Sequence, residues 1–201
     1  MAIKINLKIF IFIVFFYFTK QINMYYTIMV FALLHEIGHI VAGIALGLKP
    51  EKLTILPYGM SITFKHEIHT IKKELIIALS GPLVNLLVII VCFIFKINSE
   101  IVIYSNILLG LFNLIPIYPL DGGRVLKSIL TLKIGMKQSI IYTNKTSNIT
   151  TIIFSIFAIT LGIIYSNIAI VLLLIYLWTL IIIENKRYRF KIKVYEHLYN
   201  N

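Results

Sequence analysis

The residues best suited to chemistry form an H-E-x-x-H pattern at 35–39 inside an apolar stretch. On a helix, residues four positions apart lie on one face, so His35 and His39 can both reach one zinc ion at about 2.0–2.1 Å. Glu36 projects beside them and can take a proton from a water activated by the metal. Ionisable groups are costly to bury in an apolar span, so this trio indicates a catalytic site.

A catalytic zinc ion needs a third protein ligand and keeps a fourth position open. The chain contains a single aspartate, Asp121, in the stretch NLIPIYPLDGG at 113–123. Prolines and glycines interrupt regular helix there and allow close backbone approach. That suits a carboxylate held on an unwound segment and aimed into a cavity, although a helix-cap role is the alternative. We therefore predict one Zn²⁺ per chain, held by His35, His39 and Asp121.

Two asparagines are weaker candidates. Asn85 closes the stretch SGPLVN at 80–85, in which Gly81 and Pro82 favour tight helix packing and a kink. Asn85 can hydrogen-bond across helices, and either Asn85 or Asn113 can hold a substrate or polarise its carbonyl. The remaining histidines lie in charged segments and are expected to be solvated: His66, His69 and His197.

The composition indicates where these residues work. Of 201 residues, 59% are hydrophobic and 13% are charged, and the mean hydropathy is +0.93. A soluble protein of this composition lacks the polar groups to cover its surface, so an ordinary soluble enzyme, a disordered chain and a fibrous protein are excluded. A multi-pass helical membrane protein is predicted. The one cysteine, Cys92, makes no internal disulfide.

Apolar stretches predict about six transmembrane helices, at 5–18, 24–48, 75–95, 101–120, 149–165 and 168–183. If they alternate from a cytosolic N-terminus, the cytosolic segments hold all the Lys and Arg residues except Lys20 and Lys96. This bias predicts a multi-pass protein of the cell membrane with both termini in the cytosol. It also explains the net charge of +11 without a nucleic-acid partner.

Two segments between or after the spans are less regular. Residues 52–64 predict a short β hairpin or edge strand at the membrane surface. Residues 187–194 alternate basic and apolar residues, which favours a basic tail on the membrane surface over a short strand. We predict one membrane-embedded domain over 1–201. Its core lies at about 24–130, with accessory helices at about 5–19 and 149–184 and a basic cytosolic tail at 185–201.

Together, the motifs at 35–39, 80–85 and 113–123 resemble those of the site-2 protease family of intramembrane zinc metalloproteases. The resemblance covers about 24–130 and implies an all-α core of three helices. It also implies that His35, His39 and Asp121 bind zinc, that Glu36 is the general base, and that Asn113 is an active-site residue.

The six-span layout is most similar to the stage IV sporulation protein FB branch. This implies a membrane-associated substrate, such as a sporulation sigma-factor precursor, and inhibitory membrane partners besides the lipid bilayer. That branch commonly carries a nucleotide-sensing CBS domain, whereas about 17 residues follow the last span here. A zinc-binding membrane transporter or metal sensor is the alternative, with a non-catalytic membrane scaffold third.

Overall fold

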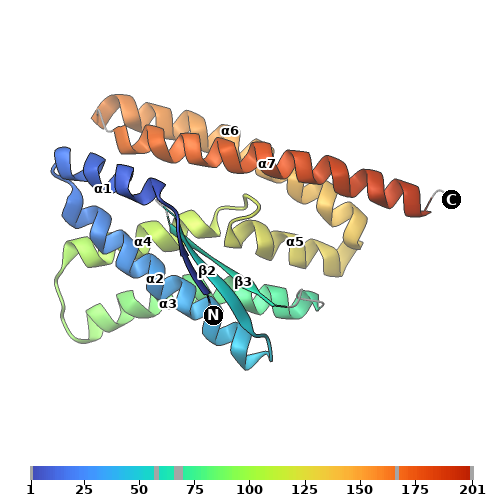
Figure 1. Ribbon diagram of the computed structural model, residues 1–201, viewed down its shortest axis with the longest axis horizontal. Helices are drawn as coiled ribbons and strands as arrows, with labels where there is room; N and C mark the ends of the chain where they lie inside the picture. The colour runs from blue at the N-terminus through green and yellow to red at the C-terminus, as the bar shows by residue number, and fades with distance from the viewer. Residues whose placement is uncertain (1, 57–58, 66–69, 166–167, 200–201) are drawn as a thin grey trace. The chain divides into compact units, whose positions relative to one another are not determined.

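The computed structural model describes residues 2–56, 59–65, 70–165 and 168–199 (Figure 1). The chain divides into two compact units, Met1–Leu114 and Ile115–Asn201. The division does not test the predicted single membrane-embedded domain, which stays a prediction.

The first unit combines helices with a small sheet. Its helices are α1 (Lys8–Phe18), α2 (Ile22–Ala45), α3 (Ile71–Ile94) and α4 (Glu100–Leu114). Its strands are β1 (Ala2–Ile5), β2 (Pro50–Leu56) and β3 (Gly59–Phe64). The sequence thus predicts most of the helices well, while α1 begins later than the expected span at 5–18.

The sheet has the order β1-β2-β3. β2 and β3 pair in antiparallel fashion, with Thr54 opposite Ser61, and β1 pairs in parallel with β2, with Lys4 opposite Thr54. The β segment predicted at 52–64 is therefore present, and β1 is an unexpected third strand. Because β2 has a neighbour on each side, the outer edges of the sheet belong to β1 and β3.

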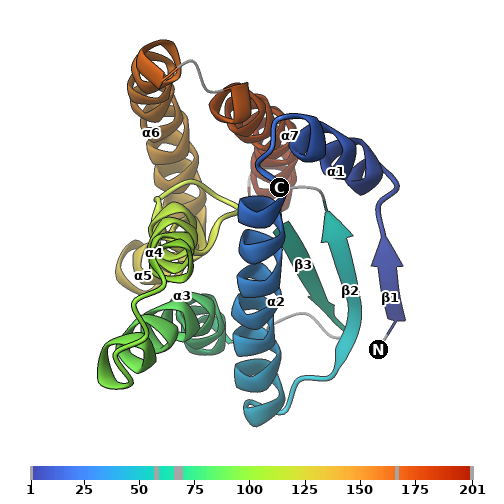
Figure 2. The same ribbon diagram turned by 90° about the vertical axis from the view of Figure 1, so that its left-hand side faces the viewer.

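Close contacts join α2 to its neighbours (Figure 2). A side chain at Gly38 of α2 would lie 2.8 Å from the Ser80 carbonyl oxygen of α3. A side chain at Gly43 would lie 2.4 Å from the Phe64 ring of β3. Because these two glycines lack a Cβ atom, α3 and the sheet can approach α2 closely. These contacts hold the helix that carries the H-E-x-x-H pattern in place.

The second unit contains α5 (Asp121–Ile134), α6 (Met136–Tyr165) and α7 (Ile168–Tyr199). Two asparagine amides join α6 to α7 reciprocally. The Asn148 amide nitrogen donates to Asn185 at 3.1 Å, and the Asn185 amide nitrogen donates to Asn148 at 3.0 Å. The Trp178 ring nitrogen also donates to the Ser155 hydroxyl at 3.1 Å. Residues 187–194 are helical, so the short-strand alternative for them is wrong.

Within the described residues, three helices are long and apolar enough to cross a membrane: Ile22–Ala45, Ile71–Ile94 and Met136–Ile164. Shorter apolar helices cover Ile9–Phe18 and Glu100–Leu114. Large apolar side chains of these helices lie exposed, including Leu87 at 58% and Phe93 at 71%. Such surfaces are compatible with lipid as the solvent. The count of six spans stays a prediction.

Candidate metal centre

His35 and His39 meet on the buried face of α2. Their side chains are 3% and 5% exposed, and their Nε2 atoms lie 3.2 Å apart. Two nitrogens bound at tetrahedral angles to one zinc ion would be separated by about 3.3 Å. The spacing of the two imidazoles therefore fits a shared metal ion.

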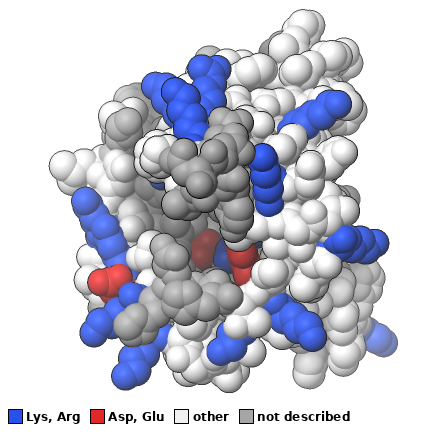
Figure 3. Space-filling view, turned by 90° about the vertical axis from the view of Figure 1, so that its right-hand side faces the viewer, with Lys and Arg blue, Asp and Glu red and all other residues white. Residues whose placement is uncertain are grey.

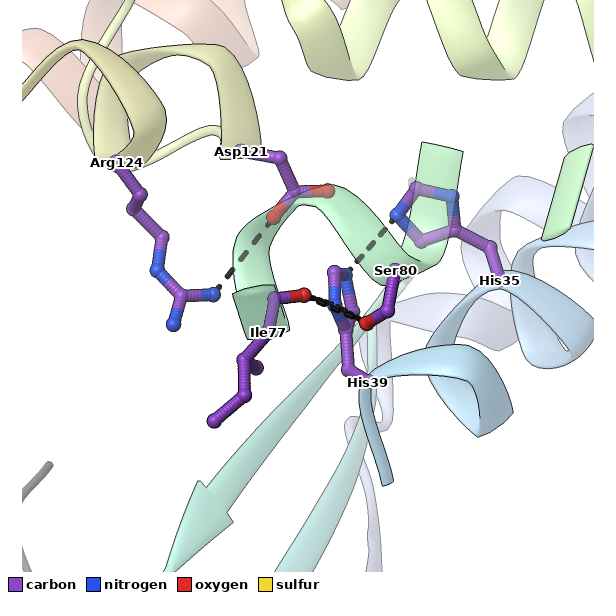
Figure 4. Close-up of polar contacts among 6 residues, drawn as sticks. All are labelled: His35, His39, Ile77, Ser80, Asp121 and Arg124. Atoms are coloured by element: carbon purple, nitrogen blue, oxygen red, sulfur yellow. Dashed lines mark hydrogen bonds and ion pairs between the residues drawn. The ribbon is translucent and has the colours of Figure 1, made fainter. Parts of the chain in front are cut away.

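The His39 ring is oriented by α3 (Figure 4). Its Nδ1 lies 2.6 Å from the Ile77 carbonyl oxygen, which can only accept a hydrogen bond. Nδ1 must therefore carry the proton, leaving the Nε2 lone pair available for a metal. The Ser80 hydroxyl donates to the same carbonyl at 2.6 Å and lies 3.3 Å from His39 Nδ1.

A chain of amides orients the His35 ring in the same way. The Val102 carbonyl accepts from the Asn106 side-chain nitrogen at 2.9 Å. This places the Asn106 oxygen toward Asn85, whose side-chain nitrogen donates to it at 2.9 Å. The Asn85 oxygen is then left to accept from His35 Nδ1 at 2.6 Å. Because the Val102 carbonyl can only accept, it fixes the direction of every hydrogen bond in this chain. His35 must therefore carry its proton on Nδ1, which leaves the Nε2 lone pair available for a metal.

Gly81 of α3 lies directly against the two ligand atoms. A Cβ atom at this position would be 2.5 Å from Nε2 of both His35 and His39. Real Cβ atoms essentially never approach another heavy atom so closely. The glycine therefore leaves open the space beside the ligand atoms where a metal ion would sit.

The other candidates of the first unit lie on α2 and α4. Glu36 is half-buried on α2, next to His35 in the chain. Asn113 is half-buried near the end of α4, and its side-chain nitrogen donates to the Leu109 carbonyl at 3.1 Å. This bond lies within one helix, so Asn113 has no part in the amide chain that orients His35.

Asp121 is the first residue of α5 in the second unit and is 6% exposed. Its carboxylate lies 3.7 Å from the Arg124 guanidinium one turn later (Figure 4). A Cβ at Gly123 would lie 2.3 Å from the Tyr118 backbone nitrogen, so only glycine allows this turn. The Tyr118 N–H donates to the Ser147 hydroxyl of α6 at 2.9 Å, which ties the irregular segment to that helix.

His35, His39 and Asp121 make up a possible metal-binding set of three buried side chains. The donor chemistry, two neutral imidazoles and one carboxylate, is that of a catalytic zinc site. Together with the orientation of both rings and the space left by Gly81, it shows that the residues present fit a zinc ion. Among the other histidines, His197 is exposed on α7 as expected, whereas His66 and His69 lie outside the described residues.

Asn106, Ile77 and Ser80 contact the site, and no site role was predicted for them from the sequence. For Asn106 a signal was available, because a buried amide in an apolar helix requires hydrogen-bond partners. No sequence signal could identify the Ile77 carbonyl, because every residue has one.

The Asn85 contacts make a direct prediction about metal binding. An Asn85→Ala variant should bind zinc about 10- to 100-fold more weakly, because His35 loses the acceptor that fixes its ring and its tautomer. The measurement is a zinc titration against a competing chelator. Asn113→Ala is the matched control, since that amide is bonded only within α4, and it should leave zinc affinity unchanged. Equal affinities in all three proteins would contradict the orienting role.

Comparisons with known proteins find similarity to metalloproteases. Residues 99–161, which include Asp121, match the model of Peptidase family M50. A zinc metalloprotease of Methanocaldococcus jannaschii is 39% identical over 116 residues, covering 53% of this chain and 34% of the relative. Stage IV sporulation protein FB of Bacillus subtilis is 24% identical over 128 residues, covering 60% of this chain and 44% of the relative. The chain thus spans less than half the length of these relatives.

The structural comparison covers more of the chain. A solved structure of the site-2 protease from Methanocaldococcus jannaschii matches with a TM-score of 0.69 and 26% sequence identity. The match covers 90% of this chain and 89% of the other. It therefore includes most of each unit, whereas the sequence matches above cover 53% and 60% of the chain.

Proposed function

We propose that this chain, a member of the site-2 protease group of Peptidase family M50, is an intramembrane zinc metalloprotease. It would hydrolyse a peptide bond of a membrane-associated or transmembrane protein. The observation that carries the proposal is the His35–His39 pair, in which both Nδ1 atoms are engaged and both Nε2 atoms lie 3.2 Å apart. A buried pair with this orientation has little use except to bind a metal.

Asp121 is proposed as the third protein ligand. Its burial, its place beside glycines that allow a tight turn, and its donor type support this assignment. The Arg124 guanidinium lies 3.7 Å from the carboxylate and places a positive charge beside it.

The proposed mechanism is metal-assisted peptide hydrolysis. Bound zinc would polarise the scissile carbonyl and lower the pKa of the attacking water. Glu36 would accept the proton of that water and pass it to the leaving amine. Asn113 would donate from its amide to the developing oxyanion. Asn85 has both ends of its amide engaged by His35 and Asn106, so we assign it to positioning His35 rather than to holding substrate.

The proposed setting is the cell membrane, with several spans and both termini in the cytosol. The excess of basic residues supports this topology, and Figure 3 shows a face on which lysine and arginine predominate over acidic side chains. The name of the sporulation relative supports a sporulation substrate, for which we propose a sigma-factor precursor held at the membrane. Inhibitory membrane partners would regulate its cleavage.

A zinc transporter or metal sensor is the less favoured candidate. Transport needs polar groups along a path through both leaflets. After Asn85, the rest of α3 reads LLVIIVCFI, with no polar side chain able to carry an ion. This supports a site closed on one side.

The test is co-expression of the chain with a tagged sporulation sigma-factor precursor. Cells that hold both should accumulate a shorter precursor fragment, and the purified protein should contain one zinc ion per chain. A fluorescent protein that folds only in the cytosol should fluoresce when fused to the C-terminus. Zinc without cleavage would contradict the sporulation substrate, whereas absence of zinc would overturn the ligand assignment and the function with it.

A further inference from the structure

The second unit contains a pocket whose lining includes none of the proposed metal ligands. It lies among α5, α6 and α7 and opens to the surface, so that its space of about 410 Å³ includes open solvent. Most of the lining surface is apolar, and the side chains with polar groups that matter below are Tyr118, Lys127, Thr143, Glu184 and Lys191. The proposed peptidase chemistry gives none of them a task.

Thr143 marks the pocket as a binding site. Hydroxyl groups recur at every fourth position along α6, at 139, 143, 147, 151 and 155. Four of them donate to a backbone carbonyl three or four residues earlier, at 2.7–2.9 Å. Thr143 is 4% exposed, and its hydroxyl has no hydrogen-bond partner within the described part of the chain. A buried hydroxyl that lines a pocket without a partner is costly unless a ligand or water supplies one.

The charged side chains that line the pocket favour binding of an anion. The Lys127 and Lys191 ammonium groups lie 5.4 and 6.0 Å from the centre of the Tyr118 ring, so both cations contact the same lining side chain. Among the described residues that line the pocket, the one carboxylate is that of Glu184, which accepts from the Arg187 guanidinium at 2.6 Å. Two lysines against one carboxylate, itself paired with Arg187, give the lining an excess of positive formal charge.

The position of the pocket along α6 and α7 fits a headgroup. The sequence of α6 becomes apolar after Asn148, and that of α7 stays apolar until Glu184. The Asn148–Asn185 amide pair aligns these two transitions across the helix pair. Lys127, Thr143 and Lys191 therefore lie just beyond the apolar part of the hairpin, at the level where lipid phosphates are found.

We propose that this pocket binds an anionic phosphate group, with the Thr143 hydroxyl and the Lys127 and Lys191 ammonium groups as donors. The phosphate can belong to an anionic lipid headgroup or be a free phosphate, because both present the same oxygens. The proposal rests on the membrane setting proposed above but does not depend on peptidase activity.

The test is calorimetric titration of the full detergent-solubilised chain with three probes: dioctanoyl phosphatidylglycerol, dioctanoyl phosphatidylcholine and inorganic phosphate. Phosphatidylglycerol should bind, and phosphatidylcholine should bind at least about tenfold more weakly. Binding should fall at least about tenfold in the double variant Lys127→Gln/Lys191→Gln. The control Lys133→Gln/Lys193→Gln removes the same charge from the same helices outside the pocket lining, and it should bind like the wild type.

Thr143→Val keeps the shape of the side chain and removes its hydroxyl. This variant tests phosphate binding in the pocket if the lysine variant fails to fold. It should weaken binding about tenfold, while Thr160→Val should not. Binding of inorganic phosphate identifies a free-phosphate site, and binding of phosphatidylglycerol alone identifies a lipid site; both support the proposal. Equal binding of both lipids, equal loss in both lysine variants, or an unchanged Thr143→Val would overturn it.

Discussion

A Glu36→Gln variant is expected to keep one zinc ion per chain and to cleave substrate about 10²- to 10⁴-fold more slowly than the wild type. The amide has the size of the carboxylate but cannot accept the proton of the attacking water. The flanking proposed ligands His35 and His39 keep their bonds to Asn85 and Ile77, so the metal site should persist. The measurements are zinc content of the purified protein and the rate at which the shortened precursor appears.

Glu51→Gln is the control for this experiment. Glu51 is an exposed residue of β2 in the same unit, and its substitution removes the same charge. It should leave both zinc content and cleavage unchanged. If Glu36→Gln cleaved at the wild-type rate, another group would have to be the general base, and a transporter or scaffold would regain support.

A Gly81→Ala variant is expected to bind zinc at least about 100-fold more weakly. Its methyl group would lie 2.5 Å from both Nε2 atoms, so the imidazoles would have to move. Neither ring can rotate freely, because the Ile77 carbonyl and the Asn85 amide hold the Nδ1 atoms at 2.6 Å. The distances between a metal ion and its ligand atoms vary by only about 0.2 Å among functional sites. A zinc titration against a competing chelator measures the loss.

Gly110→Ala provides the matched comparison. A Cβ at Gly110 of α4 would meet the Asn85 side chain at 3.6 Å, an ordinary contact. Alanine also favours helix over glycine by about 1 kcal/mol, so the fold should be unharmed and zinc affinity unchanged. A Gly81→Ala variant that bound zinc as tightly as Gly110→Ala would show that the space beside Gly81 is not the metal position.

The spacing of His35 and His39 predicted their common face, because four residues return a helix to nearly the same direction. Their orientation was beyond the sequence, because it depends on atoms of α3 and α4 that are distant in the chain. Asn85 illustrates the difference. Its residue type allowed either a substrate contact or a bond between helices, and only the three-dimensional structure shows both ends of its amide engaged within the protein.

The elements were predicted unevenly for a similar reason. Apolar stretches identified α2 and α3, because stretches of this length are too long for a strand. The strand β1 has four residues and pairs in parallel with β2, about 50 positions away. Its sequence therefore offers neither a hairpin turn nor a long alternating pattern from which the strand could be predicted. Asp121 was expected on an unwound segment at the end of a span over 101–120, whereas α4 ends at Leu114 and Asp121 is the first residue of α5. The prolines at 116 and 119 indicated the interruption but not the helix after it.

The hydroxyl row of α6 has a consequence for how the last two helices assemble. Four of the five hydroxyls donate within their own helix, so they do not depend on α7 for an acceptor. Asn148 and Asn185 differ, because each side-chain amide completes the other. Sliding one helix by a turn would break the reciprocal Asn148–Asn185 bonds and the bond from the Trp178 ring nitrogen to the Ser155 hydroxyl. These contacts between side chains, rather than the hydroxyls bonded within α6, therefore set the register of the hairpin.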